Sequence, residues 1–344
     1  MSSVESTQAT REQVLARIRE DSRFVLATHE NPDGDALGSL VGMHGMLTEL
    51  GKESAIFIAP EDMPLPDEYR SFPLDGLTSS PPADVAERTV VFLDCGNIDR
   101  NSASVLRNGA HLLNIDHHHD NTNFGTLNYV VPEACCTAEI IWDLMHDLGV
   151  APSPTVAQAL YVGLITDTGR FMYENTGPRA HIMAAELIEA GVDVPAVYER
   201  LYENVQPAKL TLLATALQHV QRFDSGELTL SSLSAEDFGR AEAQESYSEG
   251  IIDHLRAVRG TKVAALVREL SGPDRKGQRK VSLRATDDAV DVSAIARMQG
   301  GGGHRRAAGF TTTLQLGELV VFLRSEIAAQ LHASSDGRAA ATLA

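Results

Sequence analysis

The sequence is poor in cysteine, in aromatic residues and in positive charge, and it has no long apolar run. Only 3 of its 344 residues are cysteines. Two of them, Cys135 and Cys136, are adjacent, which argues against a disulfide framework and favours reduced thiols in a cytosolic protein. No apolar run approaches the roughly 18 residues that span a membrane. The polar first ten residues lack the pattern of a secretory signal. We therefore expect a cytoplasmic protein with no membrane contact.

The shortage of positive charge limits the class of ligand. There are 29 Lys and Arg residues against 47 Asp and Glu residues, so the formal net charge is −18. Tight binding of long nucleic acid requires many phosphates to be met by cations, which this balance disfavours. A small phosphorylated ligand remains compatible, because a metal site and a few cations can neutralise two or three phosphates locally.

The length fits two domains of the α/β class. In the first, short apolar segments alternate with helical spacing, which predicts a parallel sheet with helices on both faces. The strands are expected at 23–28, 54–58, 89–93 and 111–115, and the helices at 11–20, 35–50, 138–148, 155–165 and 179–190. This domain should cover 11–190.

A helical linker is expected at 191–222, and a smaller α/β domain at 223–334. In that domain we expect strands at 228–233, 262–270 and 280–284, the last two joined as a hairpin by the turn-rich SGPDRKGQ. Helices are expected at 250–258 and 317–331. Residues 1–10 and the tail beyond Ser334 are expected to be disordered.

Acidic and imidazole side chains follow three of the strands expected in the first domain. The first strand leads into His29, Asp33 and Asp35, the second into Asp94, and the third into Asp116-His117-His118-His119. A helix ends at Asp167. Because ligands of an open parallel sheet bind beyond the carboxyl ends of its strands, these groups could converge on one crevice.

Taken singly, each of these residues has an ordinary structural explanation. A lone Asp after a strand is usually a turn residue or a helix cap, and His119 and the scattered histidines are expected to be packed or solvated. Four carboxylates buried together without cations would cost many kcal/mol, however. We therefore expect divalent metals. Carboxylates with two imidazoles suit Mn²⁺, with Mg²⁺, Co²⁺ and Zn²⁺ as alternatives. Cys95 could ligate, but a buried thiol fits it better.

These segments resemble the motifs of the DHH phosphoesterase superfamily: His29-x3-Asp33-x-Asp35, Asp94, Asp116-His117-His118 and Asp167-Thr168-Gly169. The run from Gly300 to Gly309, GGGGHRRAAG, resembles the signature of the DHH-associated C-terminal domain. The resemblance covers about residues 20 to 330. Motif order and length are most similar to the bacterial nanoRNase/pAp-phosphatase branch, whose members degrade oligonucleotides of two to a few residues, remove the 3′-phosphate of pAp or cleave linear pApA.

The resemblance implies a role for each motif residue. His29 and Asp33 would hold one Mn²⁺ ion, and Asp35, His117 and Asp167 a second, with Asp94 bridging the two. The catalytic residues would be Asp116, which orients a ligand, and His118, which contacts the scissile phosphate. Two metals roughly 3.5–4 Å apart would activate water for in-line attack.

The glycine run is interpreted as a phosphate-binding loop. It is not a Walker A motif, since no Gly-Lys-Ser/Thr follows. Glycine lets backbone N–H groups approach phosphate closely. The substrate contacts expected from this run are Gly302, Gly303, His304 and Arg305. The resemblance adds Arg284, at a position that touches the terminal phosphate of the substrate.

Several alternatives remain open. Among enzymes they are a cyclic-dinucleotide phosphodiesterase and a DHH-type pyrophosphatase, although the glycine run argues against the pyrophosphatase. The length and the acidity of the chain disfavour a long-strand exonuclease like RecJ. Outside enzymes, the chain could be a nucleotide-binding or sensor protein that kept the fold. Short nucleotides are the expected partners, and the resemblance leaves a homodimer open.

Overall fold

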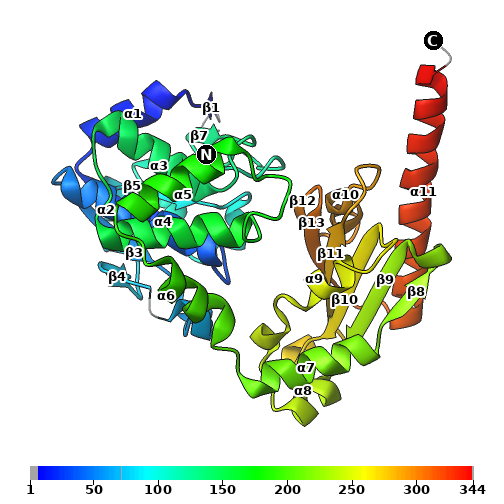
Figure 1. The fold of residues 1–344 in the computed structure, drawn as a ribbon. Helices are drawn as coiled ribbons and strands as arrows, with labels where there is room; N and C mark the ends of the chain where they lie inside the picture. Colours follow the sequence, from blue (N-terminus) through cyan, green and yellow to red (C-terminus); the bar gives the residue numbers. More distant parts are fainter. Residues whose placement is uncertain (1–6, 71, 343–344) are drawn as a thin grey trace. The chain divides into compact units, whose positions relative to one another are not determined.

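The computed structural model describes residues 7–70 and 72–342, in two compact units (Figure 1). The first unit is Met1–Asn204 and the second is Val205–Ala344. The segment expected as a linker is divided between them. α6 (Val194–Tyr198) and the π-helical η6 (Glu199–Glu203) belong to the first unit, and α7 (Pro207–Gln218) and β8 (Gln221–Phe223) to the second.

The sheet of the first unit has seven strands in the order β1-β7-β6-β5-β2-β3-β4, and each neighbouring pair is parallel. The strands are β1 (Thr7–Gln8), β2 (Arg23–Ala27), β3 (Glu53–Phe57), β4 (Leu77–Thr78), β5 (Thr89–Leu93), β6 (His111–Asp116) and β7 (Leu127–Val130). The α/β class and the parallel sheet are confirmed. The short strands β1, β4 and β7 were not predicted. The disorder expected at 1–10 is wrong for β1, and residues 1–6 lie outside the described residues.

The α-helices of this unit lie on one side of the sheet. They are α1 (Arg11–Glu20), α2 (Gly34–Glu49), α3 (Thr137–Leu148), α4 (Pro154–Asp167) and α5 (Pro178–Glu189), and α6 joins the same core through Val197. Their apolar residues form one core with alternate strand residues such as Phe24, Leu26 and Leu93. Gly38 explains the close approach of α2 and α4, because a Cβ at this position would lie 2.5 Å from the carbonyl oxygen of Ala159.

We expected α-helices on the opposite face of the sheet as well, but this face is covered differently. Its core, which includes Val25, Val90 and Phe92, is closed by loops and by the short 3₁₀ helices η3 (Val85–Glu87) and η5 (Ser104–Asn108). The connection after β5 is short and rich in Asn, Ser and Gly, so it cannot supply a long apolar helical stripe. The α-helices therefore cover one face of this sheet, and loops and short 3₁₀ helices cover the other.

The second unit is built on a six-stranded sheet in the order β12-β13-β11-β10-β9-β8. β9 and β10 are parallel, and the other pairs are antiparallel. The remaining strands are β9 (Leu228–Leu233), β10 (Val263–Glu269), β11 (Arg279–Ala285), β12 (Gly302–His304) and β13 (Ala307–Thr312). The predicted hairpin is confirmed as β10–β11. The glycine run was expected to be a loop, but part of it forms β12.

Helices pack on both faces of this second sheet. They are α8 (Ala235–Ala241), α9 (Ile251–Arg256), α10 (Val292–Arg297) and α11 (Leu316–Thr342), in addition to α7. α7, α8 and α9 enclose one core with Ala264 and Leu266, while α10 and α11 enclose the other with Val281 and Leu283. The expected disorder beyond Ser334 is wrong, since α11 continues to Thr342.

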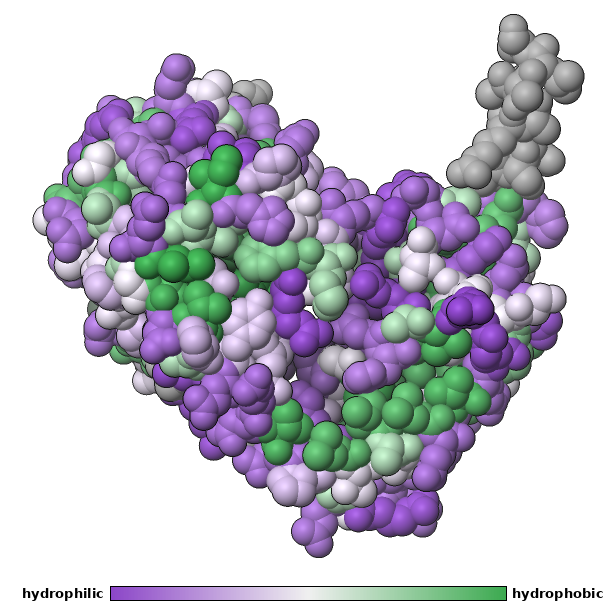
Figure 2. All heavy atoms as spheres, in the orientation of Figure 1, coloured by the Kyte–Doolittle hydropathy of each residue, from purple (hydrophilic) through white to green (hydrophobic). Residues whose placement is uncertain are grey.

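Apolar side chains also reach the surface. Figure 2 shows them gathered over α7, whose Leu210 and Leu217 are exposed. Among the described residues, no helix is both long enough and apolar enough to cross a membrane.

Candidate metal centre

Three neighbouring strands deliver polar side chains to one edge of the first sheet. β6, β5 and β2 are adjacent and parallel, so their carboxyl ends lie together. β2 leads to His29, β5 to Asp94, and β6 to Asp116 and His117. The start of α2 and the end of α4 bring their own carboxylates to the same place, because α2 follows β2 and packs against α4.

The side chains predicted as metal ligands come together in this part of the chain. His29, Asp33 and Asp94 offer ligand atoms that all lie within 4.8 Å of one another, and so do Asp35, Asp94 and His117. Asp94 belongs to both of these groups, as the bridging prediction requires, and a further group joins it to Asp116 and His118.

His117 lies at the centre of the second group. Its Nε2 is 3.9 Å from Asp35 Oδ2, 3.6 Å from Asp94 Oδ1 and 3.7 Å from Asp167 Oδ2. Its Nδ1 is 3.3 Å from the carbonyl oxygen of Ala134, which directs Nε2 toward the carboxylates. This geometry favours the first histidine of the tandem as the ligand.

Asp94 adopts an unusual backbone conformation. Its φ is +55°, in the left-handed region that costs a non-glycine residue on the order of 1 kcal/mol. Its N–H donates to the carbonyl oxygen of Ile115 at 3.1 Å, and Oδ1 accepts a 3.1 Å hydrogen bond from Thr137 Oγ1. The turn aims a buried carboxylate at three imidazoles: His29 at 3.5 Å, and His117 and His118 each at 3.6 Å. Burial opposes ionisation, but the hydrogen bond with His29 and the charges of His118 and His117 outweigh it, so the pKa of Asp94 is lower than usual.

Asp35 is buried at the start of α2 and is held by the start of another helix. The backbone N–H groups of Thr137 and Ala138, at the start of α3, donate to its two oxygens at 2.7 and 2.9 Å. Burial, and then the nearby charge of Asp94, nevertheless hold the pKa of Asp35 well above its usual value.

Asp116 lies behind the cluster and orients its neighbours. It is fully buried, and its Oδ1 lies 2.8 Å from His118 Nδ1 and accepts a 2.8 Å hydrogen bond from the His117 N–H. Asn121 donates to its other oxygen at 2.5 Å. Burial disfavours the charged imidazole, yet the charge and hydrogen bond of Asp116 raise the pKa of His118 to about 10.

The two remaining carboxylates are more accessible. Asp33 is exposed and caps α2, accepting from the N–H groups of Asp35 and Ala36 at 3.1 Å. Asp167 ends α4, where the carbonyl end of the helix disfavours negative charge. The Asn175 amide donates to Asp167 Oδ2 at 3.3 Å and to the Asp167 carbonyl at 3.2 Å.

The cluster fits divalent cations. Within the described part of the chain, the ion-pair partners of Asp35 and Asp94 are imidazoles, and neither carboxylate meets a Lys or Arg side chain. The raised pKa of Asp35 indicates that its negative charge is poorly compensated by the protein. Oxygen and imidazole donors are suited to Mn²⁺ and Mg²⁺. Cys95 lies in neither ligand group, and burial raises the pKa of its thiol to about 12, so a structural thiolate site is not supported.

The residues predicted as substrate contacts lie in the second unit. Gly302, Gly303 and His304 form β12, and Arg284 lies on β11. The Arg305 guanidinium contacts residues outside the glycine run. It donates a hydrogen bond to the Asp288 carbonyl at 2.8 Å and lies 4.0 Å from an Asp291 carboxylate oxygen.

Sequence reasoning did not identify the residues that hold the ligands in place. Thr137, Asn121 and Asn175 contact Asp35, Asp116 and Asp167 from segments remote in sequence or without periodicity. Their local signals, such as the Asn-Thr-Gly after Glu174, are also typical of ordinary turns.

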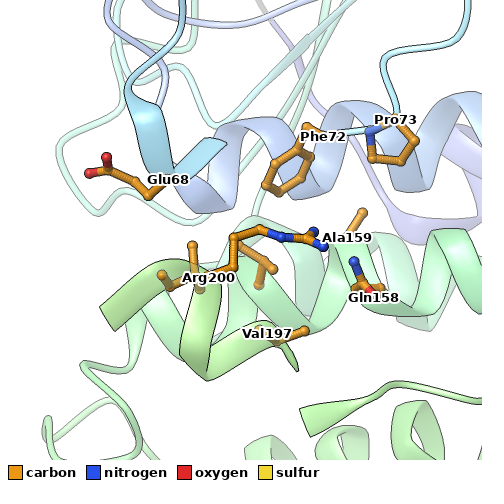
Figure 3. Close-up of a pocket in the computed structure, with 9 residues that line it drawn as sticks. Glu68, Phe72, Pro73, Gln158, Ala159, Val197 and Arg200 are labelled. Carbon is orange, nitrogen blue, oxygen red and sulfur yellow. The ribbon is translucent and has the colours of Figure 1, made fainter. Parts of the chain in front are cut away.

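A small hollow lies along α4 (Figure 3). Its volume is about 10 Å³, and it is lined by residues such as Phe72, Ala159, Val197 and Arg200. None of the predicted ligands lines it, and it is no larger than a single water requires. It does not compete with the metal cluster as the functional site.

Comparison with known proteins agrees with the geometry. Residues 23–164 match the DHH family, N-terminal domain, and residues 235–329 match the DHHA1 domain. The chain is 34% identical over 290 residues to the bifunctional oligoribonuclease and PAP phosphatase NrnA of Thermus thermophilus, covering 83% of each protein. It is 26% identical over 292 residues to the Bacillus subtilis protein of the same name, covering 83% of this chain and 88% of that one.

Solved structures share the fold. An exopolyphosphatase-related protein from Bacteroides fragilis superposes with a TM-score of 0.81 at 22% identity, covering 92% of this chain and 95% of that one. RecJ from Thermus thermophilus, solved in complex with Mn²⁺, gives a TM-score of 0.51 at 15% identity, covering 93% of this chain and 54% of that one. The chain therefore belongs to the DHH family of phosphoesterases and is an enzyme of that family, with a DHHA1 domain in its second unit.

Proposed function

We propose that this enzyme hydrolyses phosphate esters of short nucleotides with two divalent cations, Mn²⁺ being the best fit. The substrates would be oligoribonucleotides of two to a few residues, pAp, which gives AMP, and linear pApA. The observation that carries the proposal is the shared position of Asp94 in two ligand groups at the carboxyl edge of the sheet. The names of the most similar relatives, oligoribonuclease and PAP phosphatase, support the substrate class.

The ligand sets follow from the two groups. His29, Asp33 and Asp94 would hold one cation, and Asp94 and Asp35 the other together with His117 and Asp167. When bound, two such cations lower the pKa of the attacking water and withdraw charge from the phosphoryl oxygens. Asp35 and Asp94 are suited to this role because both carboxylates are buried and already oriented by hydrogen bonds from α3.

His118 and Asp116 act beside the cations. Asp116 fixes the imidazole through Nδ1, so His118 stays protonated and its Nε2 points away from Asp116. A charged donor at this position would bind a non-bridging oxygen of the scissile phosphate, where negative charge grows in the transition state. Asn121 keeps Asp116 in place through its other oxygen.

The state of the cysteines supports a reducing cellular compartment for this protein. Cys95, Cys135 and Cys136 are free and buried. A reducing compartment such as the cytoplasm fits this state.

A substrate panel tests the proposed function. Purified protein with Mn²⁺ is incubated with pAp, pApA, 5′-phosphorylated dinucleotides, cyclic di-AMP and pyrophosphate, and the products are separated by chromatography. We expect mononucleotides from pApA and the dinucleotides, and AMP from pAp. Preferential cleavage of the cyclic dinucleotide would replace this function by a cyclic-dinucleotide phosphodiesterase. Metal and nucleotide binding without turnover of any substrate would indicate a sensor.

A further inference from the structure

A single short segment contacts the ligands proposed for one of the two cations. Residues 134–138 comprise the end of the loop before α3 and the first two residues of that helix. The carbonyl oxygen of Ala134 lies 3.3 Å from His117 Nδ1, and the first two N–H groups of α3 donate to Asp35 at 2.7 and 2.9 Å. The backbone of this segment therefore orients an imidazole and a carboxylate together.

The same segment reaches the other two ligands proposed for that cation. The carbonyl oxygen of Cys135 accepts a 2.8 Å hydrogen bond from the Asn175 amide, which also donates to Asp167 Oδ2. The Thr137 hydroxyl donates to Asp94 Oδ1 at 3.1 Å. Directly or through one amide, residues 134–138 thus contact all four ligands of this site.

The ligands that belong to the other cation alone are held from elsewhere. His29 Nδ1 lies 2.7 Å from the carbonyl oxygen of Glu30. Asp33 accepts hydrogen bonds from N–H groups at the start of α2. A displacement of residues 134–138 should therefore weaken one cation site much more than the other.

A buried carboxylate fixes this segment in place. Glu139 is only 4% exposed and lies in the first turn of α3. Its Oε2 accepts a 2.8 Å hydrogen bond from the N–H of Cys135, which precedes the helix. Cys136 is the N-cap of α3, and within the described chain its thiol makes no capping hydrogen bond. Glu139 therefore supplies the side-chain acceptor that a capping residue usually provides at the start of a helix.

The other oxygen of Glu139 is paired with a cation from α5. Arg179 Nε donates to Glu139 Oε1 at 2.8 Å, and Arg179 Nη2 donates to Asp143. The Arg179 guanidinium also lies over the ring of Trp142, 5.4 Å from its centroid. A buried ion pair often stabilises a fold no more than apolar side chains of the same volume would. Packing alone therefore does not account for a carboxylate at this position, whereas its contact with the Cys135 N–H does.

We propose that Glu139 is a positioning residue of the metal centre. By fixing residues 134–138, it sets the affinity of the cation site that Asp35, His117 and Asp167 form with the shared Asp94. The inference rests on the proposed function, because it concerns the same two cations. Groups that orient metal ligands from outside the coordination sphere commonly change metal affinity by about 10- to 100-fold. Glu139 acts through the backbone on several ligands of one cation, so its effect should fall on that cation.

The test is isothermal titration calorimetry of Mn²⁺ into full-length protein from which divalent ions have been removed by chelator, so no substrate is needed. Glu139→Leu removes both hydrogen bonds of the carboxylate, whereas Glu139→Gln keeps an oxygen that can accept from the Cys135 N–H. The matched control is Asp143→Asn. Asp143 lies one turn further along α3, its side chain is 27% exposed, and it accepts from the same Arg179.

We expect wild type and Asp143→Asn to bind two Mn²⁺ ions with the same affinities. In Glu139→Leu, one ion should bind as in wild type and the other about 10- to 100-fold more weakly. Glu139→Gln should lose only several-fold at the same site, and it carries the comparison if circular dichroism shows that Glu139→Leu is unfolded. A merely structural role would lower the Tm of these variants and leave both Mn²⁺ affinities of the folded protein unchanged.

Three results overturn the proposal: wild-type affinity for both ions in every folded Glu139 variant, an equal loss at both sites, or a loss of the same size in Asp143→Asn. The proposed function is tested separately by the wild type. A wild type that binds fewer than two Mn²⁺ ions refutes the two-cation mechanism itself. A wild type that binds two ions, with Glu139 variants that bind them equally well, leaves that mechanism standing and refutes only the role of Glu139.

Discussion

Replacing Asp94 should impair metal binding and turnover while the protein still folds. Asp94→Asn keeps the shape of the side chain and removes its negative charge, and the residue lies in both ligand groups. If it bridges two cations, the change should lower the affinity for both and reduce turnover by roughly three orders of magnitude or more, since neither the attacking water nor the phosphoryl group is then held by a complete centre.

The stability of the metal-free protein should change much less than the turnover. Asp94 and Asp35 offer oxygens within 4.8 Å of each other. At an effective dielectric constant of about 20, two negative charges at that distance repel by roughly 3.5 kcal/mol. Removing Asp94 also weakens its contacts with His29, His117 and His118, which outweigh that repulsion and keep the pKa of Asp94 low. We therefore expect an apo stability between unchanged and about 2 kcal/mol lower, equivalent to a fall of a few degrees in Tm.

Calorimetry with and without Mn²⁺ measures both effects. Mn²⁺ at about 100 times its Kd should stabilise the wild type by about 2.7 kcal/mol and should stabilise Asp94→Asn by much less. Asp99→Asn is the matched control, because Asp99 lies on the same connection after β5 with its side chain 73% exposed. An Asp94→Asn protein with wild-type turnover and wild-type stabilisation by Mn²⁺ would falsify the bridging assignment.

Three further predictions concern other parts of the enzyme. Because the pKa of His118 is raised to about 10, the protonated imidazole contributes stability that is complete below pH 6.5 and lost as the pH rises through 10. A denaturant titration of metal-free protein should show that the free energy of unfolding falls by a few kcal/mol, to order of magnitude, over this range. The substitution His118→Gln should abolish this pH dependence. Asn175→Leu should weaken Mn²⁺ binding by about 10- to 100-fold in calorimetry, because Asp167 loses its amide donor, whereas the exposed Asn108→Leu should bind like wild type; equal affinities would remove Asn175 from the account. Cleavage should be fastest for nucleotides of two to four residues, since the net charge of −18 disfavours a longer anionic strand; a twenty-mer degraded as fast as a dinucleotide at physiological salt would point to a processive nuclease.

Much of the candidate metal centre could be predicted because the residues proposed as ligands lie at the ends of strongly patterned elements. The apolar runs of β2, β5 and β6 are unambiguous, and in a parallel sheet their carboxyl ends must meet. The positions of His29, Asp94 and His117 follow from that rule alone. The bridging place of Asp94 came from family resemblance, and the ligand distances now support it.

The supporting residues could not be predicted for the opposite reason. The Thr137 N–H reaches Asp35 across 102 positions of sequence, and a contact of that kind depends on how α2 and α3 pack. Asn121 and Asn175 lie in loops, where no periodicity marks their direction.

The proposed mechanism requires that this chain bind two catalytic cations at one centre. The direct measurement is elemental analysis of protein dialysed first against chelator and then against Mn²⁺, with turnover of pAp and of a 5′-phosphorylated dinucleotide followed on the same samples. We expect no activity in the chelated sample, and two Mn²⁺ per chain with full activity after reconstitution, because His29 and Asp33 lie beside Asp94 in one ligand group and Asp35 and His117 in another. Full activity of a sample in which elemental analysis finds no metal would contradict the two-cation mechanism.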